Sequence, residues 1–207
     1  MVDEALSFDI FHPQPLLIVI SGTSGVGKDA VIKGLKRREL NLHFVVTATS
    51  RKPRAEEVDG RDYFFYSTEE FQERIDKGEF IEHALVYKEL KGIPRCQIED
   101  ALISGKDVVV KVDVQGAATL RNLYPQALLI FIIPHTVDEW VGRLKRRNTE
   151  TPETLAVRVE TAKKEVTQIN MFDYIVVNAD CQVEKAVDDI IDIINAEHHS
   201  VKHRKIL

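Results

Sequence analysis

The chain carries the stretch Gly22-Thr23-Ser24-Gly25-Val26-Gly27-Lys28, which matches the phosphate-loop pattern G-x-x-x-x-G-K. An apolar, β-branched run at residues 16–20 precedes it and is typical of a buried strand. Residues 30–38 follow it, with apolar side chains spaced along one helix face. Between a strand and a helix, such a loop turns backbone N–H groups toward phosphate oxygens, and the helix N-terminus adds its positive dipole end. The stretch therefore predicts a nucleotide-binding core.

Lys28 and Asp29 stand at the end of this loop. We expect Lys28 to reach the β- and γ-phosphates of ATP and to neutralise charge as a phosphoryl group moves. A glycine-rich turn with an incidental lysine is the alternative interpretation. Asp29 stands where the pattern has a Ser or Thr whose hydroxyl binds Mg²⁺. Its carboxylate can hold the ion through a water or repel the phosphates, so the sequence predicts ATP with Mg²⁺ and leaves the metal geometry open.

Strand-like and helical segments alternate along most of the chain. Further buried strands are expected at residues 108–112, 128–133 and 174–177, and helices at residues 117–123, 137–147, 155–169 and 183–194. Strands that alternate with helices imply a parallel sheet covered on both faces. We therefore predict an α/β fold, with a P-loop NTPase core in which helices flank a parallel β-sheet.

Two charged insertions interrupt the alternation. Residues 43–105 hold short strand-like pieces and two short helices, and Ser67 with Glu70 forms a capping-box pattern at the start of the first helix. We assign this insertion to the nucleotide that accepts the phosphoryl group, and the basic residues 138–171 to a helical lid. Both insertions belong to a single domain of 207 residues. The core is then expected at about residues 15–42, 106–137 and 172–198.

Composition narrows the class of protein. With 28 Lys and Arg against 33 Asp and Glu, the net charge is −5, and no global positive field predicts nucleic-acid binding. No apolar run approaches the roughly 20 residues that span a bilayer, so we expect a soluble protein without a membrane partner. Cys96 and Cys181 are too few for a disulfide framework or a zinc site and favour a reducing compartment. We interpret His198, His199 and His203 as a solvated tail rather than a metal site.

Residues 47–54, TATSRKPR, place Arg51 and Arg54 three positions apart beside hydroxyl side chains. Arginine is suited to forked hydrogen bonds with phosphate oxygens. Tyr63 follows shortly in the run DGRDYFF. The segment predicts a second phosphate site, with a solvated basic loop as the alternative.

Five blocks in a fixed order resemble the guanylate kinase family. They are SGTSGVGK (21–28), SRKPR…EVDGRDYFF (50–65), GEFIEHA (78–84), VDVQGA (112–117) and RLKRRNTET (143–151). The variants GKDAV and GAATLR are most similar to the plant organellar branch. The resemblance spans about residues 15–198 and implies phosphoryl transfer from ATP to GMP or dGMP, giving GDP and ADP for purine nucleotide metabolism. It leaves open a plastid, mitochondrial or cytoplasmic location, and a monomer or a homodimer.

The resemblance also implies roles for matching residues. On the ATP side, Asn178 would lie near the adenine, and the lid arginines Arg143, Arg147 and Arg158 would close over the phosphates. The ATP-binding set would then be Gly22, Thr23, Ser24, Gly25, Val26, Gly27, Lys28, Asp29 and Asn178. The catalytic set would be Lys28, Arg51, Arg143, Arg147 and Arg158. We expect no protein general base, because the GMP phosphate oxygen is already a competent nucleophile.

On the GMP side, the resemblance implies that Arg51, Arg54 and Tyr63 hold the phosphate, assisted by Thr47. Glu82 would accept hydrogen bonds from guanine N1 and N2, since adenine offers no such donor pair. Asp113 would orient the acceptor site or the waters of Mg²⁺. The full predicted GMP-binding set is Thr47, Arg51, Arg54, Tyr63, Glu82, Lys91, Gly92 and Asp113.

Three positions depart from the family. Lys91 stands in place of a tyrosine that normally touches the GMP phosphate, and it can substitute as a point charge. Ile93 stands in place of a Ser or Thr and cannot supply a hydroxyl to the base. Lys111 replaces a more usual Asp. Guanine preference is then expected to rest mainly on Glu82.

Each implied role has an alternative. Glu82 could be an exposed acid on an edge strand, and Asp113 could be the N-cap of the following helix. Arg143 and Arg147 lie one helical turn apart, so they could form a solvated basic face. Tyr63 could serve packing alone.

Two other functions fit part of the sequence. The first is a guanylate-kinase-like protein-binding module without catalysis, which only Asp29 favours. The second is a related P-loop kinase for another phosphorylated acceptor, which Lys91 and Ile93 favour.

Overall fold

β1 (Leu17–Gly22), the strand before the phosphate loop, lies at the centre of a five-stranded sheet in the computed structural model, which describes residues 13–86, 89–146 and 152–201. The strand order is β2-β7-β1-β8-β9, and every neighbouring pair is parallel. The other strands are β2 (Leu42–Phe44), β7 (Asp107–Lys111), β8 (Leu128–Ile133) and β9 (Tyr174–Val177). All five carboxyl ends therefore lie along one edge of the sheet, which is where α/β proteins bind ligands.

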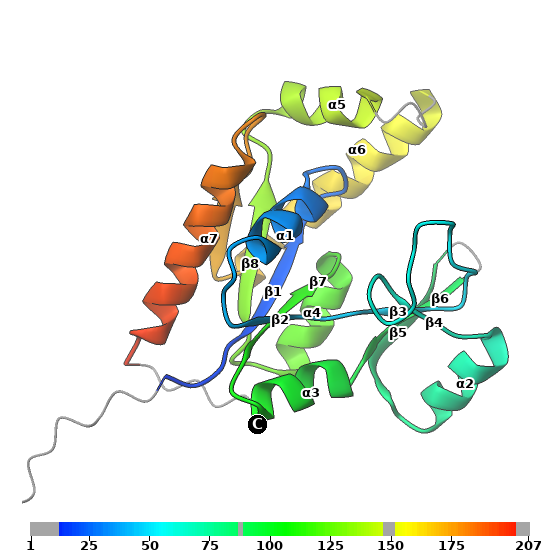
Figure 1. Ribbon diagram of the computed structural model, residues 1–207. Coiled ribbons are helices and arrows are strands. Elements are labelled where there is room, and N and C mark those ends of the chain that lie inside the picture. Colours follow the sequence, from blue (N-terminus) through cyan, green and yellow to red (C-terminus); the bar gives the residue numbers. More distant parts are fainter. Residues whose placement is uncertain (1–12, 87–88, 147–151, 202–207) are drawn as a thin grey trace, which may run out of the picture.

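Helices cover both faces of this sheet (Figure 1). They are α1 (Lys28–Lys36) and α7 (Val183–His198) on one face, and α3 (Cys96–Ile103) and α4 (Val114–Leu123) on the other. Successive side chains of a strand point to opposite faces. Accordingly, Ile18 and Ile20 pack with α1 and α7, whereas Leu17 and Val19 pack with α3 and α4. Since all four side chains are fully buried, β1 is held firmly at the point where the loop begins.

A second, four-stranded sheet projects from the core, with strand order β4-β3-β6-β5 (Figure 1). Its elements are β3 (Ala48–Thr49), β4 (Phe64–Phe65), α2 (Thr68–Asp76), β5 (Phe80–Val86) and β6 (Glu89–Pro94). The small core of this unit includes Phe71 and Phe80, whose rings stack 4.4 Å apart between centroids. α2 begins at a complete capping box, in which Ser67 and Glu70 each accept a hydrogen bond from the other's backbone N–H.

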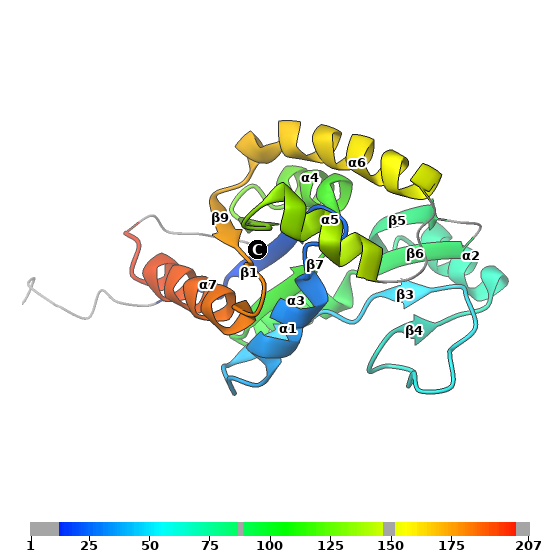
Figure 2. The same ribbon diagram turned by 90° about the horizontal axis from the view of Figure 1, so that it is seen from above.

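α5 (Val137–Arg146) and α6 (Pro152–Thr167) form a helical arm after β8, and the short 3₁₀ helix η1 (Ile169–Met171) follows α6. Trp140, Leu144 and Ala162 join the two helices in an apolar cluster of their own. Seen from above, α6 runs alongside α4 and reaches toward the four-stranded sheet (Figure 2). The phosphate loop therefore lies between the core, the arm and the second sheet.

The predicted α/β fold is confirmed, and β8 and β9 have the expected bounds. Two strands were missed. β3 has only two residues, and β6 contains Lys91, Gly92 and Pro94, which are poor strand formers. In addition, β2 pairs with β7 of the core sheet, so the inserted sheet begins only at β3.

The histidine prediction was wrong for His198. This residue ends α7, and its Nε2 lies 2.7 Å from Asp107 Oδ2 with only 23% of the side chain exposed. It ties the last helix to the start of β7 rather than lying in a solvated tail. His203 lies outside the described residues.

Candidate active site

The phosphate loop has the backbone geometry that its glycines predict. Gly25 and Gly27 have φ values of +83° and +95°, a region that glycine adopts without a steric cost. A Cβ atom at Gly27 would also collide with the side-chain amide of Asn178. Lys28 donates through Nζ to the carbonyl oxygens of Gly22 at 2.6 Å and Thr23 at 3.1 Å, so it arches back over the loop. Burial lowers the pKa of Lys28, with smaller contributions from nearby charges.

Three side chains hold the outer turn of the loop. Asn178 donates to the Val26 carbonyl at 2.8 Å from the end of β9. Arg143 of α5 donates to the same carbonyl at 3.0 Å, to the Asn178 carbonyl at 2.7 Å and to Asp180 at 2.7 Å. Trp140 donates from its indole nitrogen to the Ser24 carbonyl at 2.8 Å. The loop is therefore preformed by contacts from two separate elements.

Arg143 has only 14% of its side chain exposed, which excludes the solvated basic face for this residue. In this structure its guanidinium binds the loop backbone and Asp180. Arg147 lies outside the described residues.

α6 brings two charged side chains to the loop. Arg158 donates to the Ser24 hydroxyl at 2.6 Å. Glu165 lies near Lys28, and burial raises the pKa of its carboxyl against the opposing effect of the Lys28 charge. Because loop N–H groups and Lys28 are the groups that receive phosphate oxygens, Glu165 places a carboxylate within the phosphate site.

Asp29 and Lys111 meet beside the loop. Lys111 Nζ donates to Asp29 Oδ1 at 2.5 Å. Asp113, two residues further along, accepts a hydrogen bond from the Gly116 backbone N–H at 2.9 Å and caps α4. The N-cap interpretation of Asp113 is therefore confirmed, and it does not exclude a role in the site, because the capped helix starts at the same sheet edge as the loop.

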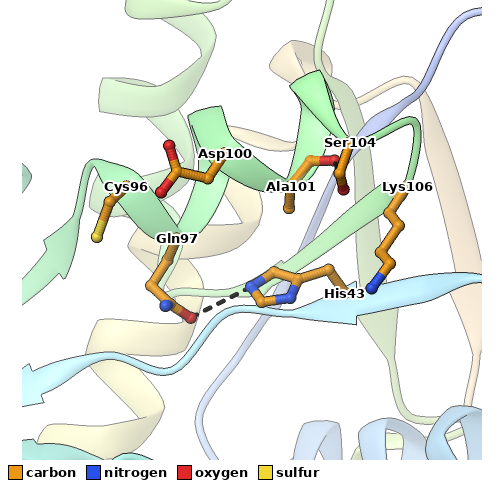
Figure 3. A pocket seen from close by; sticks show the side chains of 7 residues that line it. All are labelled: His43, Cys96, Gln97, Asp100, Ala101, Ser104 and Lys106. Carbon is orange, nitrogen blue, oxygen red and sulfur yellow. Dashed lines mark hydrogen bonds between the residues drawn. The ribbon is translucent and has the colours of Figure 1, made fainter.

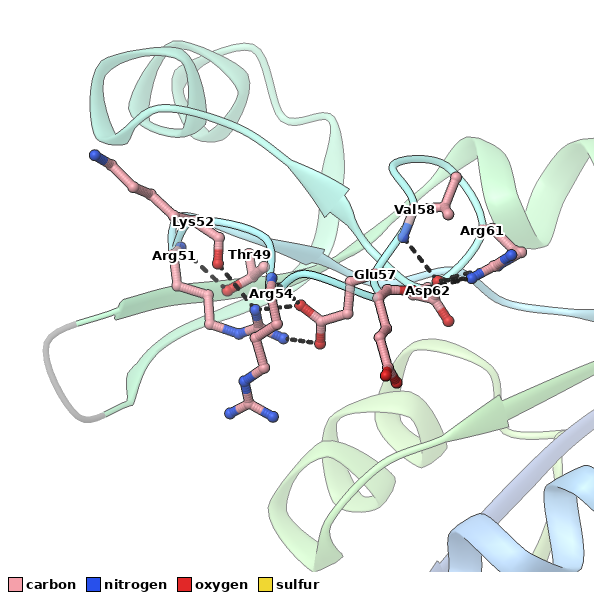
Figure 4. A network of polar contacts seen from close by, with 9 residues as sticks. Thr49, Arg51, Lys52, Arg54, Glu57, Val58, Arg61 and Asp62 are labelled. Carbon is pink, nitrogen blue, oxygen red and sulfur yellow. Dashed lines mark hydrogen bonds and ion pairs between the residues drawn. The ribbon is translucent and has the colours of Figure 1, made fainter.

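A network of polar contacts arranges the basic loop after β3 (Figure 4). Glu57 accepts two hydrogen bonds from Arg51, each of 2.6 Å, and one from the Arg54 backbone N–H at 2.9 Å. These contacts lower the pKa of Glu57 from 4.5 to about 2, with the Arg51 hydrogen bonds as the largest cause. The Arg51 guanidinium also lies over the rings of Tyr63 and Phe65, at 5.0 and 5.5 Å from their centroids. Arg51 is thus held in one orientation by an ion pair and two aromatic faces.

Glu82 lies on β5, facing α4. Burial raises the pKa of its carboxyl, and the charge of Asp113 adds to this effect. A Cβ atom added at Gly116 would stand 2.7 Å from Glu82 Oε2, so the glycine at this position leaves room for the carboxylate. Glu82 is therefore not the fully exposed edge acid of the alternative interpretation, although β5 is an edge strand.

The remaining predicted residues of the second phosphate site lie on β3 and β6. Thr47 directly precedes β3, and its carbonyl accepts the Phe64 backbone N–H at 2.9 Å. Lys91 pairs with Thr49 across the two strands and is exposed, whereas Gly92 is buried. Ile93 is 4% exposed and packs in the apolar cluster beneath the core sheet, so it is part of the core.

The sequence analysis missed several residues of the site. Glu57, Trp140 and Glu165 carry no motif of their own, because their contacts are made to segments far away in the sequence or to neighbouring turns. Lys111 was noticed only as a departure, and its pairing with Asp29 was not foreseen. The new negative charge at position 29, together with the reversal of charge at position 111, was the one signal that could have found it.

The donor set fits a metal ion that arrives with the nucleotide. In the part of the chain that the structure describes, no three His, Cys, Asp or Glu side chains gather into a metal site of their own. Mg²⁺ with ATP usually takes one or two carboxylates and fills its other positions with phosphate oxygens and waters. Asp29 has 69% of its side chain exposed directly after Lys28, so it can supply such a carboxylate.

A separate pocket of about 220 Å³ lies between β2 and α3 (Figure 3). His43 and Gln97 line it and are joined at 3.2 Å, and Lys106 lies at its edge. Of the residues that the structure describes, none from the phosphate loop lines this pocket. It is therefore not part of the nucleotide site. None of the helices in the described ranges is long and apolar enough to cross a bilayer.

A parallel sheet with a phosphate loop, an arginine-bearing second sheet and a helical arm over the loop define a P-loop nucleoside monophosphate kinase. A sequence model of the family described as "Guanylate kinase" matches residues 14–197. The chain belongs to this family.

Individual relatives agree. The chain is similar to guanylate kinase 2, chloroplastic/mitochondrial, of Oryza sativa subsp. japonica, with 50% identity over 94% of this chain and 68% of the relative. It is also similar to guanylate kinase of Caldanaerobacter subterraneus, with 41% identity over 94% of this chain and 93% of the relative. The crystal structure of guanylate kinase from Anaplasma phagocytophilum superposes with a TM-score of 0.71 at 28% identity, covering 92% of this chain and 90% of that one.

Proposed function

We propose that the site described above carries out the family's reaction, in which the γ-phosphoryl group of ATP passes to GMP to give GDP and ADP. Family membership makes the chain an ATP-dependent nucleoside monophosphate kinase that acts on GMP. The single observation that best supports the assignment of residues is that two separate groups suited to phosphate are each held in place by the fold. One is the phosphate loop, and the other is the Arg51 guanidinium in the loop after β3.

On the ATP side, we assign Lys28 and the backbone N–H groups of residues 22–28 to the phosphates. Arg158 reaches the loop at Ser24 from the arm and can add a further positive charge. Arg143 and Asn178 hold the loop in shape, and contact of either with the nucleotide stays a prediction. Mg²⁺, which we expect to arrive with ATP next to Asp29, would neutralise charge on the phosphates.

On the GMP side, we assign Arg51, Arg54 and Tyr63 to the phosphate and Glu82 to guanine N1 and N2. To bind the GMP phosphate, Arg51 must give up its hydrogen bonds to Glu57 or share its N–H groups between Glu57 and the phosphate oxygens. The aromatic rings keep the guanidinium in place during this exchange. Thr47, Lys91, Gly92 and Asp113 complete the predicted set. Phosphoryl transfer then depends on in-line positioning and charge neutralisation, without a protein general base.

The relatives also guide a proposal on the compartment and the oligomeric state of the protein. We propose that the chain works in a reducing compartment of a plastid, a mitochondrion or the cytoplasm, as a monomer or a homodimer. The organellar assignment in the name of the rice relative and the two exposed free thiols, Cys96 and Cys181, support this proposal.

The test is ADP release from Mg·ATP with and without GMP, for the native protein and for Lys28→Ala. We expect GMP-dependent release in the native protein and a loss of turnover of about 10³-fold in the variant, because a preorganised charge is removed from the transferring group. GMP binding, measured by calorimetry, is expected to survive. Lys33→Ala, on an exposed position of α1, is the matched control. Near-native turnover in Lys28→Ala would overturn the assigned mechanism.

A further inference from the structure

Asp29 and Lys111 depart from the phosphate-loop pattern and the family resemblance respectively, and they bind each other. Asp29 lies in the first turn of α1, and Lys111 is the last residue of β7. The parallel pairing of β1 with β7 sets Lys111 opposite Ile20, two residues before the loop. This register carries the Lys111 ammonium group to the Asp29 carboxylate, at 2.5 Å.

Stability does not explain this ion pair. The side chains are 42% exposed at Lys111 and 69% exposed at Asp29. Exposed ion pairs contribute little to the free energy of folding, because solvent screens the charges and ordering two side chains costs entropy. The position of the pair, beside the ATP phosphate site, is therefore the informative property.

The charged groups around Lys28 show how the Asp29–Lys111 ion pair affects the electrostatics of the phosphate site. Four charged groups act on the ammonium group: Glu165, Lys111, Asp29 and Asp113. Three of them are carboxylates, and each repels a triphosphate. With Ser or Thr at position 29, the site would hold one carboxylate fewer. With Asp at position 111, it would hold one carboxylate more. Lys111 is the one cation among these four groups. It binds Asp29, the carboxylate that stands where the phosphate-loop pattern has a hydroxyl.

We propose that Asp29 and Lys111 act as one unit in ATP binding. Asp29 replaces the missing hydroxyl as the protein ligand of the nucleotide's metal ion, directly or through a water. Lys111 is a positioning residue that orients the Asp29 carboxylate and offsets its charge against the phosphates. This inference rests on the ATP site proposed above, and it explains why the two departures occur together.

The test is a double-mutant cycle with Asp29→Ser, Lys111→Asp and the double variant. ATP affinity is measured by calorimetry in Mg²⁺ and in EDTA, and the ratio of the two affinities reports metal dependence. In Asp29→Ser, the unpaired Lys111 ammonium group would stand against the metal ion that a serine hydroxyl binds, so ATP affinity in Mg²⁺ should fall by about tenfold. In Lys111→Asp, two facing carboxylates would repel each other and the phosphates, so ATP affinity in Mg²⁺ should also fall by about tenfold, and the affinity in EDTA should fall further.

The double variant restores a hydroxyl opposite a carboxylate. Its ATP affinity in Mg²⁺ should therefore return to within about threefold of the native value, although each single change lowers it and two independent losses would multiply to about a hundredfold. Lys185→Asp is the matched control, because Lys185 forms a similarly exposed pair with Asp189 on α7. It should leave both affinities unchanged, and all variants should keep the native melting temperature within a few degrees.

Each outcome decides the question. If the two single losses of affinity in Mg²⁺ multiply in the double variant, or if no variant changes that affinity, the pair is an ordinary surface contact and the inference fails. If the native protein does not bind ATP in Mg²⁺ or in EDTA, the proposed ATP site fails, and this inference fails with it.

Discussion

The two proposed phosphate sites of this molecule use different groups. The proposed ATP site consists mainly of main-chain N–H groups, and its loop is held by buried or half-buried contacts from Asn178, Arg143 and Trp140. The proposed GMP site consists of side chains on a partly exposed loop, where Glu57 and aromatic rings hold Arg51. A main-chain site tolerates changes in side chains that point away from the ligand, whereas a side-chain site depends on each of its residues. With the exception of Lys28, we therefore expect single substitutions to affect GMP more strongly than ATP.

The largest effect should follow the loss of Arg51. Arg51→Ala removes a forked, charge-assisted contact with the GMP phosphate, so kcat/KM for GMP should fall by about 10²-fold. Arg51→Lys should recover only part of this loss, because a lysine offers a point charge without the fork. KM for ATP should stay close to the native value in both variants. An equal rise of both KM values would mean that the two sites are not separate.

A smaller effect should follow Gly116→Ala. The new methyl group would stand 2.7 Å from Glu82 Oε2 and displace the carboxylate. Steady-state kinetics should show a loss of about tenfold in kcat/KM for GMP, with ATP unaffected, because small misplacements of a binding group are costly. Gly142→Ala on α5 is the matched control, since an added Cβ atom there meets nothing within 4 Å. Equal behaviour of the two alanine variants would remove Glu82 from the base site.

The smallest effect concerns pH and folding. The pKa of Glu57 falls from 4.5 to about 2 in the folded chain. A lowered carboxyl pKa stabilises the folded state above the unfolded value, and this contribution disappears as pH falls from about 4.5 toward 2. Urea unfolding between pH 6 and 2 should therefore show a shallower loss of stability in Glu57→Gln than in the native protein. Parallel curves for the two proteins would show that the Arg51–Glu57 pair does not form in solution.

The same contrast explains what the sequence could reveal. The ATP loop was predictable because a run of seven residues encodes both its glycine conformations and its lysine, and the flanking strand and helix were visible as apolar patterns. The core strands β8 and β9 were predicted from continuous apolar runs, which mark buried strands. Only β8 is buried, because β9 lies at the edge of the sheet with Ile175 and Val177 exposed. Local sequence patterns were therefore sufficient to predict most of the core sheet and the phosphate loop.

The GMP side was less visible. Strands as short as β3 leave no periodicity, and β6 carries residues that disfavour strands. The spacing of Arg51 and Arg54 predicted a phosphate site with a solvated basic loop as the alternative, whereas Glu82 was named only through family resemblance. The partners Glu57, Glu165 and Lys111 act through contacts that only the folded chain creates, so residue type alone could not assign them.

The most direct test of the account compares acceptors in the native protein and in Glu82→Ala. ADP release from Mg·ATP is followed with GMP, dGMP, AMP, UMP and CMP. The account predicts strong turnover with GMP and dGMP, weak turnover with the others, and a collapse of the GMP preference in the variant while ATP binding persists. An unchanged preference for GMP in Glu82→Ala would contradict the assignment of Glu82 as the residue that reads the base.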